Sequence, residues 1–353
     1  MVQAIAKELI LRKNELKNKL IETIYFGGGT PSLLTISELQ FLMDTVYQNY
    51  KVVSNPEITL EANPDDLNQN YLSFRAESRN LYQEYQKIGI NRLSIGIQSF
   101  FEADLKAMNR AHTAKESELC LQYATEYFDN ITIDLIYGIP NMSNSQWLEN
   151  LNKAFRFNVP HISSYALTVE PKTALHAFIK KGNYPAINDS LALQHFKTLQ
   201  SETQKQGFIQ YEVSNFSKEN YFSKHNTSYW QGHKYLGVGP AAHSYNGITR
   251  SWNCANNIKY LKAIADNILP QEIENLSTND RFNETVMTGL RTIWGVSLDK
   301  IEQEFGMTYK TQLLKTSEKY IAQGLLHKDK EKLKTTSKGL FLADGIAADL
   351  FVI

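Results

Sequence analysis

Residues 23–31 read Thr-Ile-Tyr-Phe-Gly-Gly-Gly-Thr-Pro, an apolar strand-like run that ends in three glycines. Adjacent glycines permit positive φ and leave backbone N–H and C=O groups open to close approach by a ligand. The run fits neither a GxGxxG dinucleotide fingerprint nor a Walker A loop, because no Gly-Lys-Ser/Thr follows it. By itself it predicts a tight turn between a strand and a helix, and it leaves open whether that turn binds a ligand.

The chain beyond this turn alternates short apolar runs with longer helical stretches. The other predicted strands are residues 58–64, 92–99, 131–140 and 161–168. The predicted helices are residues 1–20, 37–50 with Ser37 as N-cap, a stretch up to 87, 114–128 and 144–157. This alternation indicates βαβ units and a parallel sheet, and the nearly continuous apolar strands indicate that both faces are covered. We therefore predict an α/β fold, a partial and open β/α barrel with parallel strands.

Each predicted strand carries a polar residue at its carboxyl end. These residues are Thr30, Glu61 with Asn63, Gln98, Asp134 and Tyr165. Turns are polar in general, so one such residue would mean little. In barrel enzymes this end of the strands holds the active site. Five polar ends in register favour a ligand-binding rim.

Composition restricts the class of protein. The chain has 353 residues, and 37 basic residues balance 37 acidic ones, so the formal net charge is zero and a nucleic-acid partner is not expected. It has no apolar run of about 18 residues, so we expect no transmembrane helix. Residues 1–10 show an amphipathic helix pattern and not a signal peptide, which favours the cytoplasm. The two cysteines, Cys120 and Cys254, lie too far apart in sequence for a disulfide framework or a metal motif, and we expect them to be structural.

The pattern becomes less regular after about residue 180. Residues 211–216 and 235–239 are predicted to be irregular strands, and the chain becomes helical from about 258. It closes with residues 320–326, a Lys-rich hairpin over 328–338 and a last apolar segment. Helices followed by a charged hairpin indicate a small winged-helix-like domain, for which the neutral charge favours packing over DNA binding. We predict a barrel domain over 1–250 and a C-terminal domain over 251–353.

Several of these segments together resemble a known family. They are the glycine turn, Leu-Glu-Ala-Asn-Pro at 60–64, Arg-Leu-Ser-Ile-Gly-Ile-Gln-Ser at 92–99 and Ile-Asp-Leu-Ile-Tyr-Gly-Ile-Pro at 133–140. In this order they are similar to the radical S-adenosylmethionine (SAM) coproporphyrinogen III oxidase (HemN) superfamily, over nearly the whole chain. Tyr-Glu-Val-Ser-Asn-Phe at 211–216 and the HNxxYW pattern at 225–230 resemble its HemW branch, whose members are regarded as heme chaperones.

The resemblance implies roles for the residues of the rim. Gly27, Gly28, Gly29 and Thr30 would hold the methionyl amino group of SAM, and Glu61 would accept from its ribose hydroxyls. Gln98 and Arg110 would contact the carboxylate and ribose region, which suits the planar fork of arginine. The remaining expected contacts are Asp134 near the ribose, and Tyr165, Ala166 and Leu167 at the adenine.

The same resemblance implies a heme site at His225, Asn226 and Tyr229. Neutral imidazole is a good ligand for iron, and Tyr229 or Trp230 would pack against a porphyrin. A single histidine is more often structural, which keeps the structural reading open for His225. His233 and His243 show no metal-binding spacing, and we expect them to be structural.

The sequence departs from the family in three places, the smallest of which is Gly-Ile-Pro-Asn-Met at 138–142, where the family commonly has Gly-Gln after the proline. Radical SAM proteins carry CxxxCxxC on the loop after the first strand to hold a 4Fe–4S cluster, and residues 1–353 contain no such motif. The chain begins at what resembles the helix after that loop, so we interpret it as N-terminally truncated, without its first strand or metal ligands. The second departure is a linker at 67–79 that is longer than the family's usual helix.

The leading expectation is a heme chaperone-like protein that binds heme and passes it to an unknown acceptor protein. The superfamily consists of oxidoreductases, so whether this chain is an enzyme stays open. The alternative is an oxygen-independent coproporphyrinogen III oxidase of porphyrin biosynthesis, in which a 5′-deoxyadenosyl radical takes hydrogen from propionate side chains. The HNxxYW pattern and the missing cluster motif argue against that alternative. A third possibility is poor folding, because a barrel without its first strand has unprotected edges.

Overall fold

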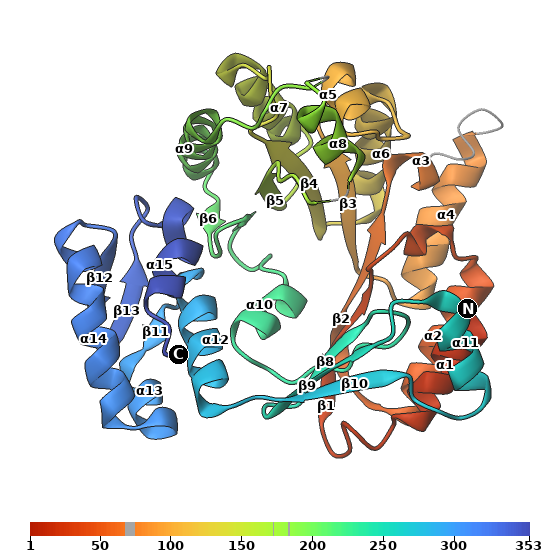
Figure 1. Ribbon diagram of the computed structural model, residues 1–353. Coiled ribbons are helices and arrows are strands. Elements are labelled where there is room, and N and C mark those ends of the chain that lie inside the picture. Colours follow the sequence, from red (N-terminus) through yellow and green to blue (C-terminus); the bar gives the residue numbers. More distant parts are fainter. Residues whose placement is uncertain (68–74, 172, 183) are drawn as a thin grey trace. The chain divides into compact units, whose positions relative to one another are not determined.

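The computed structural model describes residues 1–67, 75–171, 173–182 and 184–353 (Figure 1). These described residues form two compact units. The first unit consists of residues 1–24, 35–56 and 223–353, and the second of residues 25–34 and 57–222. The long linker predicted at residues 67–79 includes residues 68–74, which lie outside the described part of the chain.

The main sheet has seven strands within the described residues, in the order β1-β2-β3-β4-β5-β7-β6. Strands β2 to β5 pair in parallel. Strand β7 pairs antiparallel with β5, and β6 pairs antiparallel with β7. The strands are β1 Leu20–Phe26, β2 Lys51–Ala62, β3 Arg92–Gln98, β4 Ile131–Tyr137, β5 His161–Ala166, β6 Ile209–Gln210 and β7 Asn215–Ser217. The predicted α/β fold with an open and mostly parallel sheet is confirmed.

Helices alternate with these strands (Figure 1). They are α1 Val2–Leu11, η1 Pro31–Leu33, α2 Ile36–Asn49, α3 Pro64–Leu67, α4 Arg75–Ile88, α5 Glu102–Ala107, α6 Ala114–Tyr127, α7 Asn144–Arg156, α8 Ala174–Lys180 and α9 Asp189–Lys205. The helices predicted at 114–128 and 144–157 match α6 and α7, each of which begins with a capping box. In the part of the chain that is described, no helix has the length and apolar character needed to cross a membrane.

Two predicted helix ends are wrong. The N-cap of α2 is Thr35 and not Ser37, because the Thr35 hydroxyl accepts from the backbone N–H of Glu38 while the Glu38 carboxylate accepts from Thr35 N–H. The helix predicted over 1–20 ends at Leu11. The following residues form turns, and Asn18 has a φ of 64°, which a right-handed helix cannot contain.

The first unit contains a small antiparallel sheet in the order β10-β9-β8. The strands of this sheet are β8 His243–Tyr245, β9 Thr249–Asn253 and β10 Gln271–Asn275, and the helices of this region are α10 Lys224–Trp230 and α11 Asn257–Ala265. The strand predicted at 235–239 is wrong: within this segment Tyr235 forms an isolated bridge to Tyr245, and Gly239, with a φ of 104°, leaves the extended conformation. The strand predicted at 211–216 is wrong over most of its length. Asn215 N–H donates to the Glu212 carbonyl, which forms a turn, and β7 begins only at Asn215.

The last part of the chain has the helix and hairpin order of a winged-helix fold. Its elements are α12 Thr278–Leu290, β11 Val296–Ser297, α13 Leu298–Phe305, α14 Met307–Ala322, β12 Leu326–Asp329, β13 Lys332–Thr335, η2 Leu340–Leu342 and α15 Ala343–Asp349. The predicted Lys-rich hairpin is the antiparallel pair of β12 and β13, to which β11 is added. Phe282, Val286 and Leu290 of α12 are fully buried in the core beneath it.

A buried carboxylate joins α1 to the residues around β8 and β9. The Glu8 side chain has no exposed surface and accepts from Gly239 N–H at 2.8 Å and Tyr260 Oη at 2.6 Å. Its second oxygen accepts from Asn253 Nδ2 at 2.8 Å and Arg12 Nη1 at 3.0 Å. A buried charge is costly unless it is paired and hydrogen-bonded, and this network meets both conditions.

We predict that Glu8→Ala destabilises the first unit strongly. The substitution leaves the buried Arg12 guanidinium without its buried partner, which costs about 3–5 kcal/mol in comparable pairs. Glu15→Ala is the matched control, because Glu15 also pairs with Arg12 but is 42% exposed. Its loss should cost less than about 1 kcal/mol. Urea unfolding followed by circular dichroism measures both; equal costs would contradict the assignment of Glu8 as the essential partner.

Candidate functional site

The glycine turn after β1 is built around the carboxylate of Glu61. Tyr25 donates its hydroxyl to Glu61 Oε1 at 2.7 Å, and Gly28 N–H donates to Oε2 at 3.0 Å. A Cβ on Gly27 would lie 2.7 Å from Glu61 Cδ and 2.4 Å from Tyr25 Cε1, so only glycine fits there. A Cβ on Gly29 would meet no described atom within 4 Å. One side of the turn is therefore closed by Glu61, and the other is open to a ligand.

Tyr25 is a site residue that sequence reasoning missed. Burial and the neighbouring Glu61 charge raise the pKa of its hydroxyl, so it remains a protonated donor at neutral pH. The signal was its place two residues before the first glycine, where a strand side chain can reach the turn. Thr30 ends the turn and precedes η1, which starts with Pro31.

A second carboxylate, Asp134, lies close to Glu61. It occupies the middle of β4 and not its end as predicted, and it lies opposite Ser163 of β5. Burial, with the Glu61 charge second, raises the pKa of Asp134 to about 7, although a hydrogen bond with Ser163 and the positive charge of Arg110 oppose this. A group with this pKa changes its charge near neutral pH, which is typical of functional sites.

Arg110 and Tyr165 both interact with Asp134. Arg110 follows the turn after α5, and burial lowers its pKa while attraction to Asp134 and Asp65 opposes the shift. Tyr165 is 45% exposed, and burial together with the Asp134 charge raises the pKa of its hydroxyl. The predicted residues Glu61, Arg110, Asp134 and Tyr165 thus lie near one another, and their assignment to SAM stays a prediction.

Gln98 ends β3 in an unusual conformation. Its φ is 65°, and the register between β3 and β4 shifts there. A left-handed conformation at a residue other than glycine costs about 1–3 kcal/mol and is concentrated at functional sites. A Cβ on Gly96 would lie 2.8 Å from Gln98 Nε2, so the glycine makes room for this side chain.

Ala166 and Leu167 form a backbone edge at the end of β5. Ala166 lies opposite Tyr137 of β4, and Leu167 N–H donates to the Tyr137 carbonyl at 2.8 Å. Both side chains are half-buried. The expected contact of this edge with the adenine of SAM stays a prediction.

His225 lies on α10 in the first unit, and both of its ring nitrogens have hydroxyl partners. Nδ1 is 2.8 Å from Thr23 Oγ1, and Nε2 is 2.9 Å from Tyr229 Oη. Burial lowers the pKa of His225 to about 4, so the imidazole is neutral at physiological pH. A histidine held at one nitrogen has a fixed orientation, as metal-ligating histidines commonly do.

The other residues of this site have different roles. Tyr229 is 39% exposed, its ring contacts the edge of His225 at 4.8 Å between centroids, and burial raises its pKa to about 12. Asn226 donates its backbone N–H to Ser223 Oγ, and Ser223 is the N-cap of α10. Thr23 and Tyr235 were missed, since Thr23 lies 202 residues away in sequence. Tyr235 contacts the Tyr229 ring at 4.5 Å.

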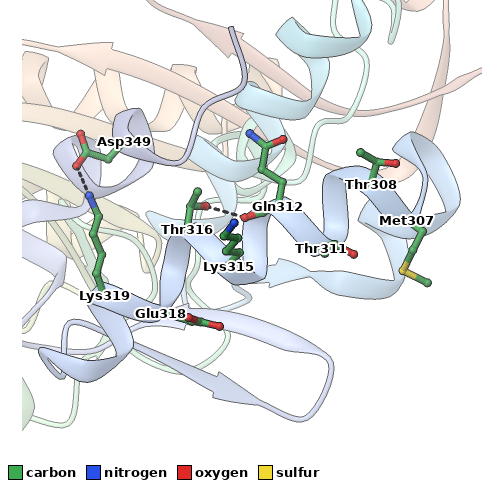
Figure 2. Close-up of a pocket in the computed structure, with 9 residues that line it drawn as sticks. All are labelled: Met307, Thr308, Thr311, Gln312, Lys315, Thr316, Glu318, Lys319 and Asp349. Atoms are coloured by element: carbon green, nitrogen blue, oxygen red, sulfur yellow. Dashed lines mark hydrogen bonds and ion pairs between the residues drawn. The ribbon is translucent and has the colours of Figure 1, made fainter.

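A pocket of about 1000 Å³ lies along α14 (Figure 2). Figure 2 shows Thr316, which donates to the Gln312 carbonyl, and Lys319, which forms an ion pair with Asp349 at 3.0 Å. None of the predicted site residues lines it. With its charged residues partly paired and its shape open, this pocket is a weaker candidate than the glycine turn or α10.

Comparisons with known proteins support the sequence resemblance. The family model of the radical SAM superfamily matches residues 3–155, and that of the HemN C-terminal domain matches residues 276–342. Heme chaperone HemW of Bacillus subtilis is 30% identical over 348 residues, which is 98% of this chain and 89% of the relative. Heme chaperone HemW of Mycobacterium tuberculosis H37Rv is 31% identical over 98% of this chain and 85% of its own length.

The fold has a close counterpart among solved structures. The structure of coproporphyrinogen III oxidase (HemN) from Escherichia coli, a radical SAM enzyme, has a TM-score of 0.80. The likeness covers 99% of this chain and 82% of that chain at 20% sequence identity, so it shows the fold alone. Residue 250 lies between the two family matches, so the domain boundary predicted there stays a prediction.

We predict that Gly27→Ala destabilises the glycine turn, whereas Gly29→Ala does not. The new methyl group at residue 27 would overlap Glu61 and Tyr25, and overpacking of this kind costs about 1–3 kcal/mol. At residue 29 the methyl group would enter open space. Thermal unfolding of the two variants measures the difference. If Gly29→Ala is the more destabilising substitution, the described closure of the turn by Glu61 is wrong.

We predict that Asp134→Asn changes how stability depends on pH. The folded chain holds the Asp134 proton up to about pH 7, while the unfolded chain loses it near pH 4, so wild-type stability falls as pH rises through this window. The variant lacks this loss and should be more stable than wild type above pH 7, by about 1–3 kcal/mol. Unfolding between pH 4 and 8 tests it, with exposed Asp129→Asn as control. A constant difference at every pH would contradict the prediction.

Proposed function

Because the chain belongs to the radical SAM superfamily, within its HemN-like family, we propose that it acts as a heme chaperone. It binds heme and passes it to an acceptor protein. Two relatives that match almost the whole chain carry the name heme chaperone HemW. The HNxxYW pattern at 225–230 lies on one short helix, α10.

The geometry of His225 carries this proposal. Its imidazole is neutral, oriented at Nδ1 by Thr23, and paired at Nε2 with the partly exposed Tyr229 hydroxyl. Iron binding at Nε2 exchanges one hydrogen bond for a coordinate bond and leaves the Thr23 contact in place. On release, the Tyr229 hydroxyl returns to Nε2. This exchange favours the moderate affinity that a carrier needs.

We further propose that SAM binds at the open side of the glycine turn. Gly28 and Gly29 leave space for a ligand, Glu61 offers acceptor oxygens and Arg110 offers a cation. Gln98, Asp134 and the edge at Tyr165, Ala166 and Leu167 complete the proposed site. These residues would bind and orient SAM at the open side of the turn.

The residues present do not fit a 4Fe–4S cluster. Cys120 is buried on α6, where burial raises the pKa of its thiol to about 12, and Cys254 lies 134 positions later in the sequence. Among the described residues no group of three or more His, Cys, Asp or Glu side chains is arranged to hold a metal ion. We derive no reaction step through a cluster, and the predicted truncation stays a prediction.

The alternative function, coproporphyrinogen III oxidation, has weaker support. The likeness to the E. coli oxidase is at 20% identity and extends to the fold. The relatives from Bacillus subtilis and Mycobacterium tuberculosis, which are 30% and 31% identical to this chain, are named as heme chaperones.

We predict that His225→Ala weakens hemin binding by about tenfold or more, since it removes the proposed ligand to iron. Titration of the full chain with hemin, followed by the Soret band, measures the dissociation constant. His233→Ala is the matched control, because His233 lies exposed three residues beyond α10. It should bind hemin as wild type does.

Equal binding by wild type and His225→Ala would contradict His225 as the ligand. A wild-type chain without any Soret shift would overturn the proposed function itself. Anaerobic consumption of coproporphyrinogen III with SAM and a reductant, by a chain extended with a CxxxCxxC loop, would instead support the oxidase.

A further inference from the structure

The helix that carries His225 is too short to be stable by itself. Helix α10 has seven residues, and isolated helices shorter than about 12 residues are marginal in water. Its conformation therefore depends on contacts with the rest of the first unit. Two such contacts involve its last two residues, Tyr229 and Trp230, and both lead to α12 of the C-terminal domain.

The first contact runs from Tyr229 through Tyr235 to an ion pair. The Tyr229 and Tyr235 rings meet edge to face at 4.5 Å and 89°. The Tyr235 hydroxyl forms a hydrogen bond with the Arg250 side chain. Arg250 Nη1 lies 2.8 Å from Glu284 Oε1, and Glu284 belongs to α12.

The backbone around Tyr235 is fixed as well. Tyr235 and Tyr245 exchange backbone hydrogen bonds at 3.0 Å in both directions. The Arg250 guanidinium also lies over the Tyr245 ring, at 5.9 Å from its centroid. Tyr235 is thus held through both its side chain and its backbone, and it presents a firm surface to Tyr229.

The second contact is direct. The Arg291 guanidinium lies over the Trp230 ring at 5.1 Å from its centroid, a cation–π geometry. Arg291 caps the carboxyl end of α12 and forms an ion pair with Asp344 of α15. The guanidinium over Trp230 is therefore also held by an ion pair within the C-terminal domain.

Both contacts use the same face of α12. Glu284 and Arg291 are seven positions apart, which is about two helical turns. The opposite side of this helix is anchored, because Phe282, Val286 and Leu290 are fully buried in the core of the C-terminal domain. Helix α12 is therefore anchored in the core of the C-terminal domain. Its two links to α10, one from Glu284 through Arg250 and Tyr235 and one from Arg291, start about two turns apart.

We propose that Arg250 and Arg291 are positioning residues of the heme site, which makes the C-terminal domain part of that site. The inference rests on the proposed function. Both arginines hold α10 in the helical form that aligns His225 and Tyr229. When only a fraction of the chain holds this form, the apparent affinity falls by that fraction.

The test uses Arg250→Met and Arg291→Met in the full chain. Without hemin, amide hydrogen exchange of residues 224–231 should speed up by about fivefold to tenfold, because α10 then opens more often. The dissociation constant for hemin should rise by a similar factor of about five to ten. Arg291→Lys, which keeps a cation over Trp230, should restore most of both values.

Arg281→Met is the matched control. Arg281 lies on the same helix, and its guanidinium lies 5.8 Å from the ring of Phe305, which belongs to α13 and not to α10. This variant should leave exchange at 224–231 and hemin binding unchanged. Should either methionine variant fail to fold, Glu284→Gln and Asp344→Asn weaken the same two contacts and keep both arginines.

The outcomes separate this inference from the proposed function. Arginine variants that match Arg281→Met in both measurements overturn the inference, as does faster exchange with unchanged hemin affinity, which would mean a purely structural role. A wild-type chain that gives no Soret shift overturns the proposed function and the inference that rests on it. Faster exchange together with weaker hemin binding supports the inference.

Discussion

The buried carboxylate of Glu8 holds the first unit together. Because it is removed from water, each of its oxygens must find donors, and these come from residues more than 230 positions later in the chain as well as from Arg12. Arg12 in turn donates to the Gly237 carbonyl and to Ser244. Both acceptors adjoin the bridge between Tyr235 and Tyr245, so the surface that supports Tyr229 depends on α1.

The second unit uses two carboxylates in different environments. Glu61 lies among donors, the Tyr25 hydroxyl and the Gly28 amide, which hold it in a fixed position. Asp134 is half-buried, and burial together with the Glu61 charge raises its pKa to about 7. Neighbouring carboxylates whose environments differ in this way can take different roles, one accepting hydrogen bonds permanently and the other changing its charge with pH.

The sequence predicted the parts of the fold that local pattern controls. Continuous apolar runs identified β3, β4 and β5, and the longer helical stretches that follow β3 and β4 identified α6 and α7. The pattern failed at 235–239, where apolar residues look like a strand but the conformation follows from distant contacts to Tyr245 and Glu8. Thr23 and Tyr25 were missed for the same reason, because their partners lie on other elements.

The pairing of His225 Nε2 with the Tyr229 hydroxyl has a consequence for selectivity. A small hydrated metal ion must displace this hydroxyl and gains little besides one nitrogen ligand. Under the proposed function, a flat macrocycle that already holds its metal would also gain contact with the aromatic rings of Tyr229 and Trp230. The occupied imidazole would thereby discriminate against free zinc or copper ions in favour of a metal that arrives inside a large planar ring.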